Sequence, residues 1–218
     1  MDSPVDRSRK YGGKSLTVRR AERRRAFIQA GLEVFGDKGY VSSTITDLCQ
    51  SAGLARNQFY AEFDSREALL IELYEEIQSD AHTAVTESLA APAVPADFDA
   101  TVAAAMTALI ESLGTDPRRA RVCYIEMHGV SPRVEQYRVA RRQLWVDFIA
   151  DTIRNEADEN FSPPGGHTIA AWGFLGALTE LGSQWSLSDP RPPLNELVEV
   201  MTAILRALLP ADIGVSTK

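Results

Sequence analysis

The chain has 218 residues, of which 44% are hydrophobic and 24% charged, so it is long enough for one or two globular domains and too apolar for wholesale disorder. Its net charge of -7 hides an asymmetry: residues 1–66 carry 12 basic and 8 acidic side chains, whereas residues 67–218 carry 11 and 22. The net-basic part can approach nucleic-acid phosphates, and the acidic remainder limits non-specific association.

Cysteine usage and hydropathy exclude further classes. Cys49 and Cys123 lie inside apolar helical patterns, and His82, His128 and His167 are widely separated, so we expect no disulfide framework, no metal site and no cofactor. No apolar run approaches the ~20 residues of a membrane span. The charged N-terminus lacks the apolar segment of a signal peptide. We therefore expect a cytoplasmic protein in a reducing compartment, without a membrane partner.

The first predicted elements are a basic arm and a helix. Residues 1–14 are polar and contain proline and glycine, which is typical of a flexible arm. A helical spacing of apolar residues follows over residues 15–35, and Gly36 and Gly39 are expected to mark its end. The first turns of this helix are rich in arginine, at Arg19, Arg20, Arg23, Arg24 and Arg25.

Two short helices come next. Thr44 and Asp47 have the spacing of a capping box, which predicts that a second helix starts near Thr44. The tripeptide Ala52-Gly53-Leu54 is typical of a tight turn, and a third helix is predicted over residues 55–62. Its apolar anchors are Phe59 and Phe63.

Longer helices are predicted for the rest of the chain. Asp64 and Glu67 suggest a second capping box at the start of a helix over residues 65–89, and residues 90–96 interrupt the pattern. Further helices are predicted at residues 97–114, 117–129, 132–158, 167–187 and 194–209. No segment alternates with a period of two for long enough to form a strand. We predict an all-α fold of about nine helices, divided into domains at residues 15–64 and 65–218.

Three short helices with a glycine-containing turn before the third indicate a helix-turn-helix. In that motif the third helix enters the major groove of DNA, which is just wide enough for it. One side of this helix packs inward through Leu54 and the two phenylalanines. The other side presents Arg56, Asn57, Gln58 and Tyr60. Arginine can pair with guanine, and asparagine or glutamine with adenine, so these side chains are candidates for base contacts.

The stretch from Arg24 to Leu70 resembles the DNA-binding domain of the TetR family of bacterial repressors. The resemblance is carried, in order, by an Ala/Phe-rich helix ending at Phe35, then Gly39-Tyr40, Thr44, Ala52-Gly53-Leu54, Phe59-Tyr60, Phe63 and an acidic start to the next helix. The chain departs from the family pattern at four positions. Ala55 replaces a common hydroxyl cap, Asn57 and Gln58 replace frequent glycine and threonine, and Cys49 replaces alanine. Because residues 57 and 58 face the groove, we expect a different operator sequence.

The resemblance implies roles for residues near the DNA. Thr44 and Tyr60 would hold phosphates, while Arg56, Asn57 and Gln58 would touch base edges. The basic segment would add phosphate or minor-groove contacts through Arg19, Arg20, Arg23 and Arg24. Two plainer interpretations stay open: this arginine cluster as a solvated helix face, and Tyr60 as a half-buried core residue.

The resemblance also implies a homodimer and an effector cavity in the second domain. Small and apolar residues of the last two helices are the candidates for the dimer interface: Ala170, Gly173, Ala177, Leu197, Met201, Ile204 and Leu205. Candidates for the effector site are Met106, Ile110, Tyr124, Met127, His128, Trp145, Phe148, Trp172 and Leu175, with Glu126 and Glu180 as further polar contacts. Many of these side chains could equally be plain core. We expect a small, largely apolar effector.

These expectations combine into a ligand-released repressor that binds a palindromic operator on double-stranded DNA as a dimer. One alternative is a DNA-binding protein without a small-molecule ligand, acting architecturally or controlled by a protein partner. The other is a helical enzyme. The sequence contains no Ser/His/Asp arrangement, no glycine-rich phosphate loop and no HExxH motif, so we predict that the protein is not an enzyme.

Overall fold

The computed structural model describes residues 15–91, 98–156 and 161–209. Over these ranges the chain forms nine α-helices, one π-helical segment and no strand, which confirms the predicted all-α class. The helices are α1 (Leu16–Lys38), α2 (Ile45–Ala52), α3 (Arg56–Glu62), α4 (Arg66–Ala90), α5 (Phe98–Gly114), α6 (Pro117–Arg121), the π-helix η1 (Val122–Glu126), α7 (Pro132–Glu156), α8 (His167–Leu187) and α9 (Leu194–Ala207). The predicted arm, residues 1–14, lies outside the described residues.

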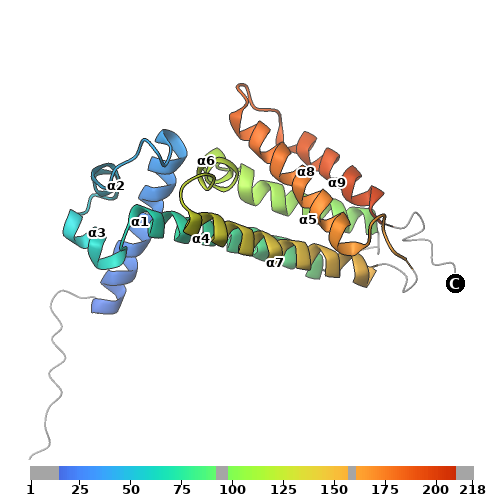
Figure 1. Cartoon of the computed structure of the whole chain (residues 1–218), viewed down its shortest axis with the longest axis horizontal. Helices are drawn as coiled ribbons and strands as arrows, with labels where there is room; N and C mark the ends of the chain where they lie inside the picture. The colour runs from blue at the N-terminus through green and yellow to red at the C-terminus, as the bar shows by residue number, and fades with distance from the viewer. Residues whose placement is uncertain (1–14, 92–97, 157–160, 210–218) are drawn as a thin grey trace, which may run out of the picture.

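The helices α1 to α3 gather at one end of the molecule, and α5 to α9 form a bundle at the other (Figure 1). The long helix α4 runs from the first group into the second, so it belongs physically to both. Helices α8 and α9 lie along one outer side of the bundle. A single hydrophobic cluster extends from Phe27 of α1 through α4 to Met201 of α9. A rotation or tilt of α4 would therefore shift packed side chains in both parts of the protein.

The end of α1 differs from the prediction. The helix continues through Gly36 to Lys38, and only Gly39, with φ of 88°, ends it. Gly36 has a packing role instead. A Cβ atom at this position would come within 2.4 Å of the Cβ of Arg118, so the missing side chain lets α1 and α6 touch.

Two other helix starts and stops also differ. The cap of α4 is Ser65, whose hydroxyl accepts a hydrogen bond from the Ala68 backbone N–H at 3.0 Å, and not the predicted pair of Asp64 and Glu67. The predicted helix over residues 117–129 is α6 followed by η1. A π-helical turn accommodates an extra residue and is often found at functional sites.

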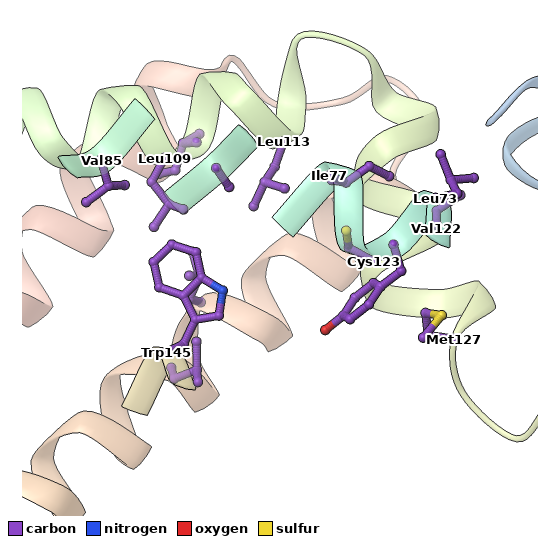
Figure 2. Packing of buried hydrophobic residues seen from close by; sticks show 14 of the residues in the cluster. Leu73, Ile77, Val85, Leu109, Leu113, Val122, Cys123, Met127 and Trp145 are labelled. Atoms are coloured by element: carbon purple, nitrogen blue, oxygen red, sulfur yellow. The ribbon is translucent and has the colours of Figure 1, made fainter. Parts of the chain in front are cut away.

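The centre of the second domain is a packed aliphatic and aromatic core. Figure 2 shows the Trp145 indole projecting from α7 toward the part of the core that carries Val85 and Leu109. Cys123 of η1 lies near Ile77 of α4 in the same view. The segment η1 is thus built into the core of the bundle, although it also contacts α1 at the other end of the molecule.

Candidate functional site

The second helix of the predicted motif is capped as expected. The Thr44 hydroxyl accepts a hydrogen bond from the Asp47 backbone N–H at 3.1 Å, and the Asp47 carboxylate accepts one from the Thr44 backbone N–H at 2.7 Å. Hydrogen bonds from Lys38 and Thr44 lower the pKa of Asp47 to about 2. Gly53 then adopts the left-handed conformation, with φ of 63°, that the turn between α2 and α3 requires. Together these features fix the entry angle of α3.

The third helix has one buried and one exposed side. Phe59 and Phe63 are buried, and Phe59 packs edge-on against Phe27 of α1 with ring centroids 5.2 Å apart. On the opposite side Arg56 and Asn57 are exposed, and Tyr60 is 48% exposed. The half-buried core interpretation of Tyr60 therefore fits the structure less well than an exposed contact residue. The arrangement offers a short rigid rod with polar side chains on its free face.

Two of the side chains predicted to face the groove already have local partners. Nη2 of Arg56 donates to the Tyr60 hydroxyl at 3.3 Å, and the guanidinium lies 5.7 Å from the Tyr60 ring centroid. The Gln58 side chain accepts a hydrogen bond from the Ala55 backbone N–H at 2.9 Å, which supplies at the start of α3 a partner that the Ala55 side chain cannot provide. A contact from Gln58 to a base edge would have to give up this bond. Asn57 is the freer candidate for reading a base.

Most arginines of the α1 cluster form ion pairs or hydrogen bonds within the protein. Glu62, at the end of α3, has a fully buried side chain that accepts hydrogen bonds from Arg20 at 3.1 Å and from Arg23 at 3.0 Å. Arg24 donates to the backbone carbonyl of Glu62 and forms an ion pair with Glu72 of α4. These three arginines therefore anchor α3 to α1. Their predicted contacts with DNA phosphates, and that of Arg19, remain predictions. Nothing in the sequence distinguishes Glu62 from a surface glutamate.

A second set of contacts holds the turn before α2. The sequence gives no indication of these contacts either. The guanidinium of Arg66, in α4, lies 4.7 Å from the Tyr40 ring centroid and donates to the Tyr40 carbonyl at 2.9 Å. From the other domain, Glu126 of η1 accepts a hydrogen bond from the Tyr40 backbone N–H at 2.7 Å and pairs with Arg121 at 2.9 Å. Glu126 therefore links η1 to the turn before α2. The contacts of its carboxylate serve this link, and its role as an effector contact remains a prediction.

Several pockets open in the part of the second domain that the structure describes, and two of them share the helices α4, α5, α7 and α8. The proximal cavity, about 50 Å³, lies on the side of the DNA-binding end and borders Tyr124, His128, Trp145 and Leu175. The distal cavity, about 210 Å³, borders Met106 and Phe148. These six residues were all predicted to face an effector. Ile110 lines a third, smaller cavity toward α9. The remaining predicted residues, Met127, Trp172 and Glu180, border none of the cavities found within the described residues.

A buried polar chain crosses the wall of the proximal cavity. The Trp145 indole N–H donates to the Gln78 carbonyl oxygen at 2.6 Å, and the Gln78 amide donates to the Cys123 sulfur at 3.4 Å. Burial raises the pKa of Cys123 to about 12, so it is present as the thiol. These bonds join α7, α4 and η1 across the core, and they fix the indole in the position that Figure 2 shows.

The outer side of α8 and α9 presents apolar surface. Ile169, Trp172 and Val200 are exposed, with Trp172 at 51%. A Cβ atom built on Gly173 or Gly176 would meet nothing, so these glycines face outward. Among the predicted interface residues, Ala170 and Met201 are buried inside the protomer, because they point to the opposite side of their helices. Leu197 and Leu205 line cavities, and Ala177 and Ile204 are half-buried. Trp172 was predicted for the effector site, but it belongs to this outer face.

Neither a membrane span nor a metal site is found where the structure can be described. No helix there is both long and apolar enough to cross a bilayer. Within the same residues no three histidine, cysteine, aspartate or glutamate side chains gather in a way that would hold a metal ion.

Comparisons with known proteins agree with this architecture. Residues 27–73 match the family described as "Bacterial regulatory proteins, tetR family". The HTH-type transcriptional regulator EthR of Mycolicibacterium smegmatis (strain ATCC 700084 / mc(2)155) is 23% identical over 195 residues, which cover 88% of each chain. The structure of the fatty acid degradation regulator FadR from Bacillus halodurans is similar with a TM-score of 0.74 at 16% identity, covering 95% of this chain and 100% of that one. The transcriptional regulator FadR from Bacillus subtilis, solved in complex with stearoyl-CoA, has a TM-score of 0.71 at 19% identity, covering 83% and 96%. The segment of residues 27–73 therefore matches the TetR family of bacterial regulatory proteins, and the described chain shares the fold of the helical regulators named above.

Proposed function

We propose that this protein is a transcription repressor that binds a palindromic operator as a homodimer and leaves it when a small effector binds. The observation that carries the proposal is the free face of α3. Arg56, Asn57 and Tyr60 stand exposed on a helix whose other side is locked into the core by Phe59. A rigid helix with exposed arginine and asparagine has the chemistry to read guanine and adenine in the major groove.

The dimer is supported by the outer face of α8 and α9. One short helix reads too few bases for specificity, and a two-fold pair presents a second helix about one DNA turn (~34 Å) away. The exposed Ile169, Trp172 and Val200, with the outward glycines of α8, form an apolar face on which two copies can approach closely. We place the interface there.

Release by an effector is supported by the contact between η1 and the turn before α2. The proximal cavity borders Cys123 and Tyr124 of η1, and Glu126 at the end of η1 holds the Tyr40 backbone. An effector that favours a different arrangement of η1 would change the position of the recognition helix, and operator affinity would fall by the difference in its affinity for the two arrangements. The Bacillus subtilis neighbour was solved with stearoyl-CoA, which supports an effector role for this type of domain.

The proposal has two corollaries. A bacterial regulator of this kind meets chromosomal DNA, so we place the protein in the cytoplasm. We also propose that it works by binding alone and not as an enzyme, because the sequence contains no Ser/His/Asp arrangement, no glycine-rich phosphate loop and no HExxH motif. An activity screen on the purified chain tests the second corollary.

The proposed function is tested by fluorescence anisotropy with the DNA that flanks the gene for this protein, over a range of salt concentrations. We expect sequence-specific binding whose affinity falls steeply with salt. Arg56→Ala should cost about 1–3 kcal/mol on the specific site and relax the sequence preference, and Tyr60→Ala should weaken binding to all sequences. The matched control is Arg154→Ala, at the exposed far end of α7. Binding that ignores sequence would contradict a repressor and favour the architectural alternative.

A further inference from the structure

The charge around the proximal cavity is unusual for its half of the chain. Residues 67–218 hold 22 acidic and 11 basic side chains. The proximal cavity nevertheless borders Arg138, Arg142 and His128, and no aspartate or glutamate is among the described residues that line it. The cavity is thus lined by two arginines and a histidine and by no acidic side chain, and this arrangement favours an anionic ligand.

Donors at this cavity lack partners within the protein. Arg138 pairs with Glu135 on its own helix, but Arg142 has no carboxylate or hydrogen-bond partner within the described ranges. Tyr74, only 6% exposed, lines the same cavity, and its hydroxyl likewise has no partner among the described residues. Burial raises the pKa of Tyr74, so its hydroxyl stays protonated and remains a donor. The Tyr74 hydroxyl and the Arg142 nitrogens are not sealed inside the protein, so both donors open on the cavity they line, and an oxyanion there would accept hydrogen bonds from both.

The distal cavity has the opposite character. It is about 210 Å³, and no charged side chain is among the described residues that line it. Its walls are mainly aliphatic and aromatic, from Val85, Met106, Ile149, Ile153, Phe174 and Leu205. Such a cavity suits an apolar chain and rejects a charged group, because burying an unpaired charge there would be strongly unfavourable.

The two cavities follow each other along the same helices. Helix α7 gives Arg142 and Trp145 to the proximal cavity and Thr152 to the distal one, and α4 gives Gln78 to the first and Leu89 to the second. With a rise of about 1.5 Å per residue, Arg142 and Thr152 are about 15 Å apart along the axis of α7. That span is of the order of a medium-length acyl chain.

Two aromatic side chains stand between the cavities. Trp145 borders the proximal and Phe148 the distal cavity, and their rings pack edge to face with centroids 5.9 Å apart. The Trp145 indole is held by one hydrogen bond to Gln78. A rotation of this indole that opens one cavity into the other would break this hydrogen bond and the edge-on contact with the His82 ring, whose centroid lies 5.6 Å away.

We propose that the two cavities are one effector site for an amphiphilic anion, with an unbranched acyl chain in the distal cavity, its anionic end against Arg142 and Tyr74, and Trp145 turned aside. This inference rests on the proposed effector role of the second domain. It revises the expectation of a largely apolar effector. The anion that fits these donors is the carboxylate of a free fatty acid, because in an acyl-coenzyme A the acyl carbon is an uncharged thioester and the pantetheine arm would carry the first phosphate beyond the proximal cavity.

The test is direct binding to the full-length chain without DNA, by calorimetry and by intrinsic fluorescence of a Trp172→Phe, Trp185→Phe variant, in which Trp145, which lines the site, is the one tryptophan left. The probes are dodecanoate, dodecanoyl-coenzyme A and dodecan-1-ol, all below the concentrations at which they form micelles. We expect dodecanoate to bind roughly tenfold or more tightly than the alcohol, because a charged hydrogen-bonded pair is lost with the alcohol. Binding of dodecanoyl-coenzyme A more tightly than dodecanoate would contradict a carboxylate contact at Arg142.

Variants separate the two ends of the site. Arg142→Gln should lower the affinity for the anion to that for the alcohol and leave the alcohol unchanged, whereas the matched Arg154→Gln should alter neither. Met106→Trp should fill the distal cavity and weaken all three probes. If circular dichroism shows that Arg142→Gln does not fold, it is replaced by Arg142→Lys, which keeps the charge and changes the geometry of the donors.

Several results would overturn the inference. Equal binding of the acids and the alcohol, or equal losses in Arg142→Gln and Arg154→Gln, would exclude an anion contact at Arg142. Butanoate binding as tightly as dodecanoate would exclude joined cavities. Operator binding is measured on the same preparation: anion binding without specific DNA binding refutes the proposed function alone, and specific DNA binding without anion binding refutes this inference alone.

Discussion

The carboxylate of Glu126 accepts a hydrogen bond from the backbone N–H of Tyr40 at 2.7 Å, although the two residues lie 86 positions apart in the chain. Glu126 ends the π-helix that lines the proximal cavity, and Tyr40 begins the turn that leads into the helix-turn-helix. Arg121 holds the other carboxylate oxygen at 2.9 Å, so the bridge is fixed on both sides. This contact joins the π-helix that borders the proximal cavity to the turn that leads into α2.

Removal of this bridge should uncouple the two domains. We expect Glu126→Ala to lower the free energy of unfolding by about 1.5–3 kcal/mol, the range for a hydrogen bond to a charged group. Effector affinity should stay close to the original, while the effector should release less operator. Urea unfolding and effector titrations of the operator complex measure both quantities. Glu180→Ala, on the exposed side of α8, is the control. Full effector release in Glu126→Ala would show that the signal travels by another route.

Glu62 should prove essential for the position of α3. Its buried carboxylate is shared by Arg20 and Arg23, and its removal leaves two guanidinium groups facing each other. Because both arginines are partly exposed and can regain water, we expect Glu62→Ala to cost about 2–3 kcal/mol, below the usual loss for a fully buried pair. Operator affinity should fall as well, since α3 loses its C-terminal anchor. Glu76→Ala on α4 is the control, and unchanged operator affinity in Glu62→Ala would contradict the anchoring role.

Asp47 should make the stability of the DNA-binding domain depend on pH. Hydrogen bonds from Lys38 and Thr44 lower the pKa of its carboxyl group to about 2, below the value of about 4 in an unfolded chain. A lowered pKa in the folded state means that the carboxylate stabilises the fold fully above pH ~4 and loses this effect as the pH falls toward ~2. We expect Asp47→Asn to have a lower Tm than the original protein near neutral pH, with the difference shrinking below pH ~4. A Tm difference between Asp47→Asn and the original protein that does not change with pH would rule out the assigned ionisation.

Trp172 should decide the oligomeric state. A charged side chain at this exposed position of α8 would be desolvated between two copies, so Trp172→Arg should weaken the dimer by at least about 2 kcal/mol, the level of an interface hot spot. Sedimentation equilibrium measures the effect. Leu144→Arg introduces the same charge at an equally exposed apolar position of α7 and should leave the dimer intact. A Trp172→Arg dimer as tight as the original would place the interface elsewhere.

Local rules in the sequence sufficed for the DNA-binding motif. The capping box of Thr44 and Asp47, the left-handed Gly53 and the alternation of buried Phe59 with exposed Tyr60 all depend on residues within one helical turn of each other. Interactions at that separation are visible as spacing, and for this reason the bounds of α2, α3 and α8 were predicted to within a residue or two. The predicted end of α1 was wrong because Gly36 packs against Arg118, which is distant in the sequence, and does not form a local turn.

The partners of charged and aromatic side chains were decided by the tertiary structure alone. The sequence carries no mark that Glu62 binds two arginines of α1, that Glu126 reaches Tyr40, or that Trp172 faces outward while Trp145 faces a cavity. Periodicity tells which side of a helix is apolar, but not which neighbour covers it. That choice depends on how α4, α7 and α8 pack around one another, and it only becomes determinate when the whole bundle forms.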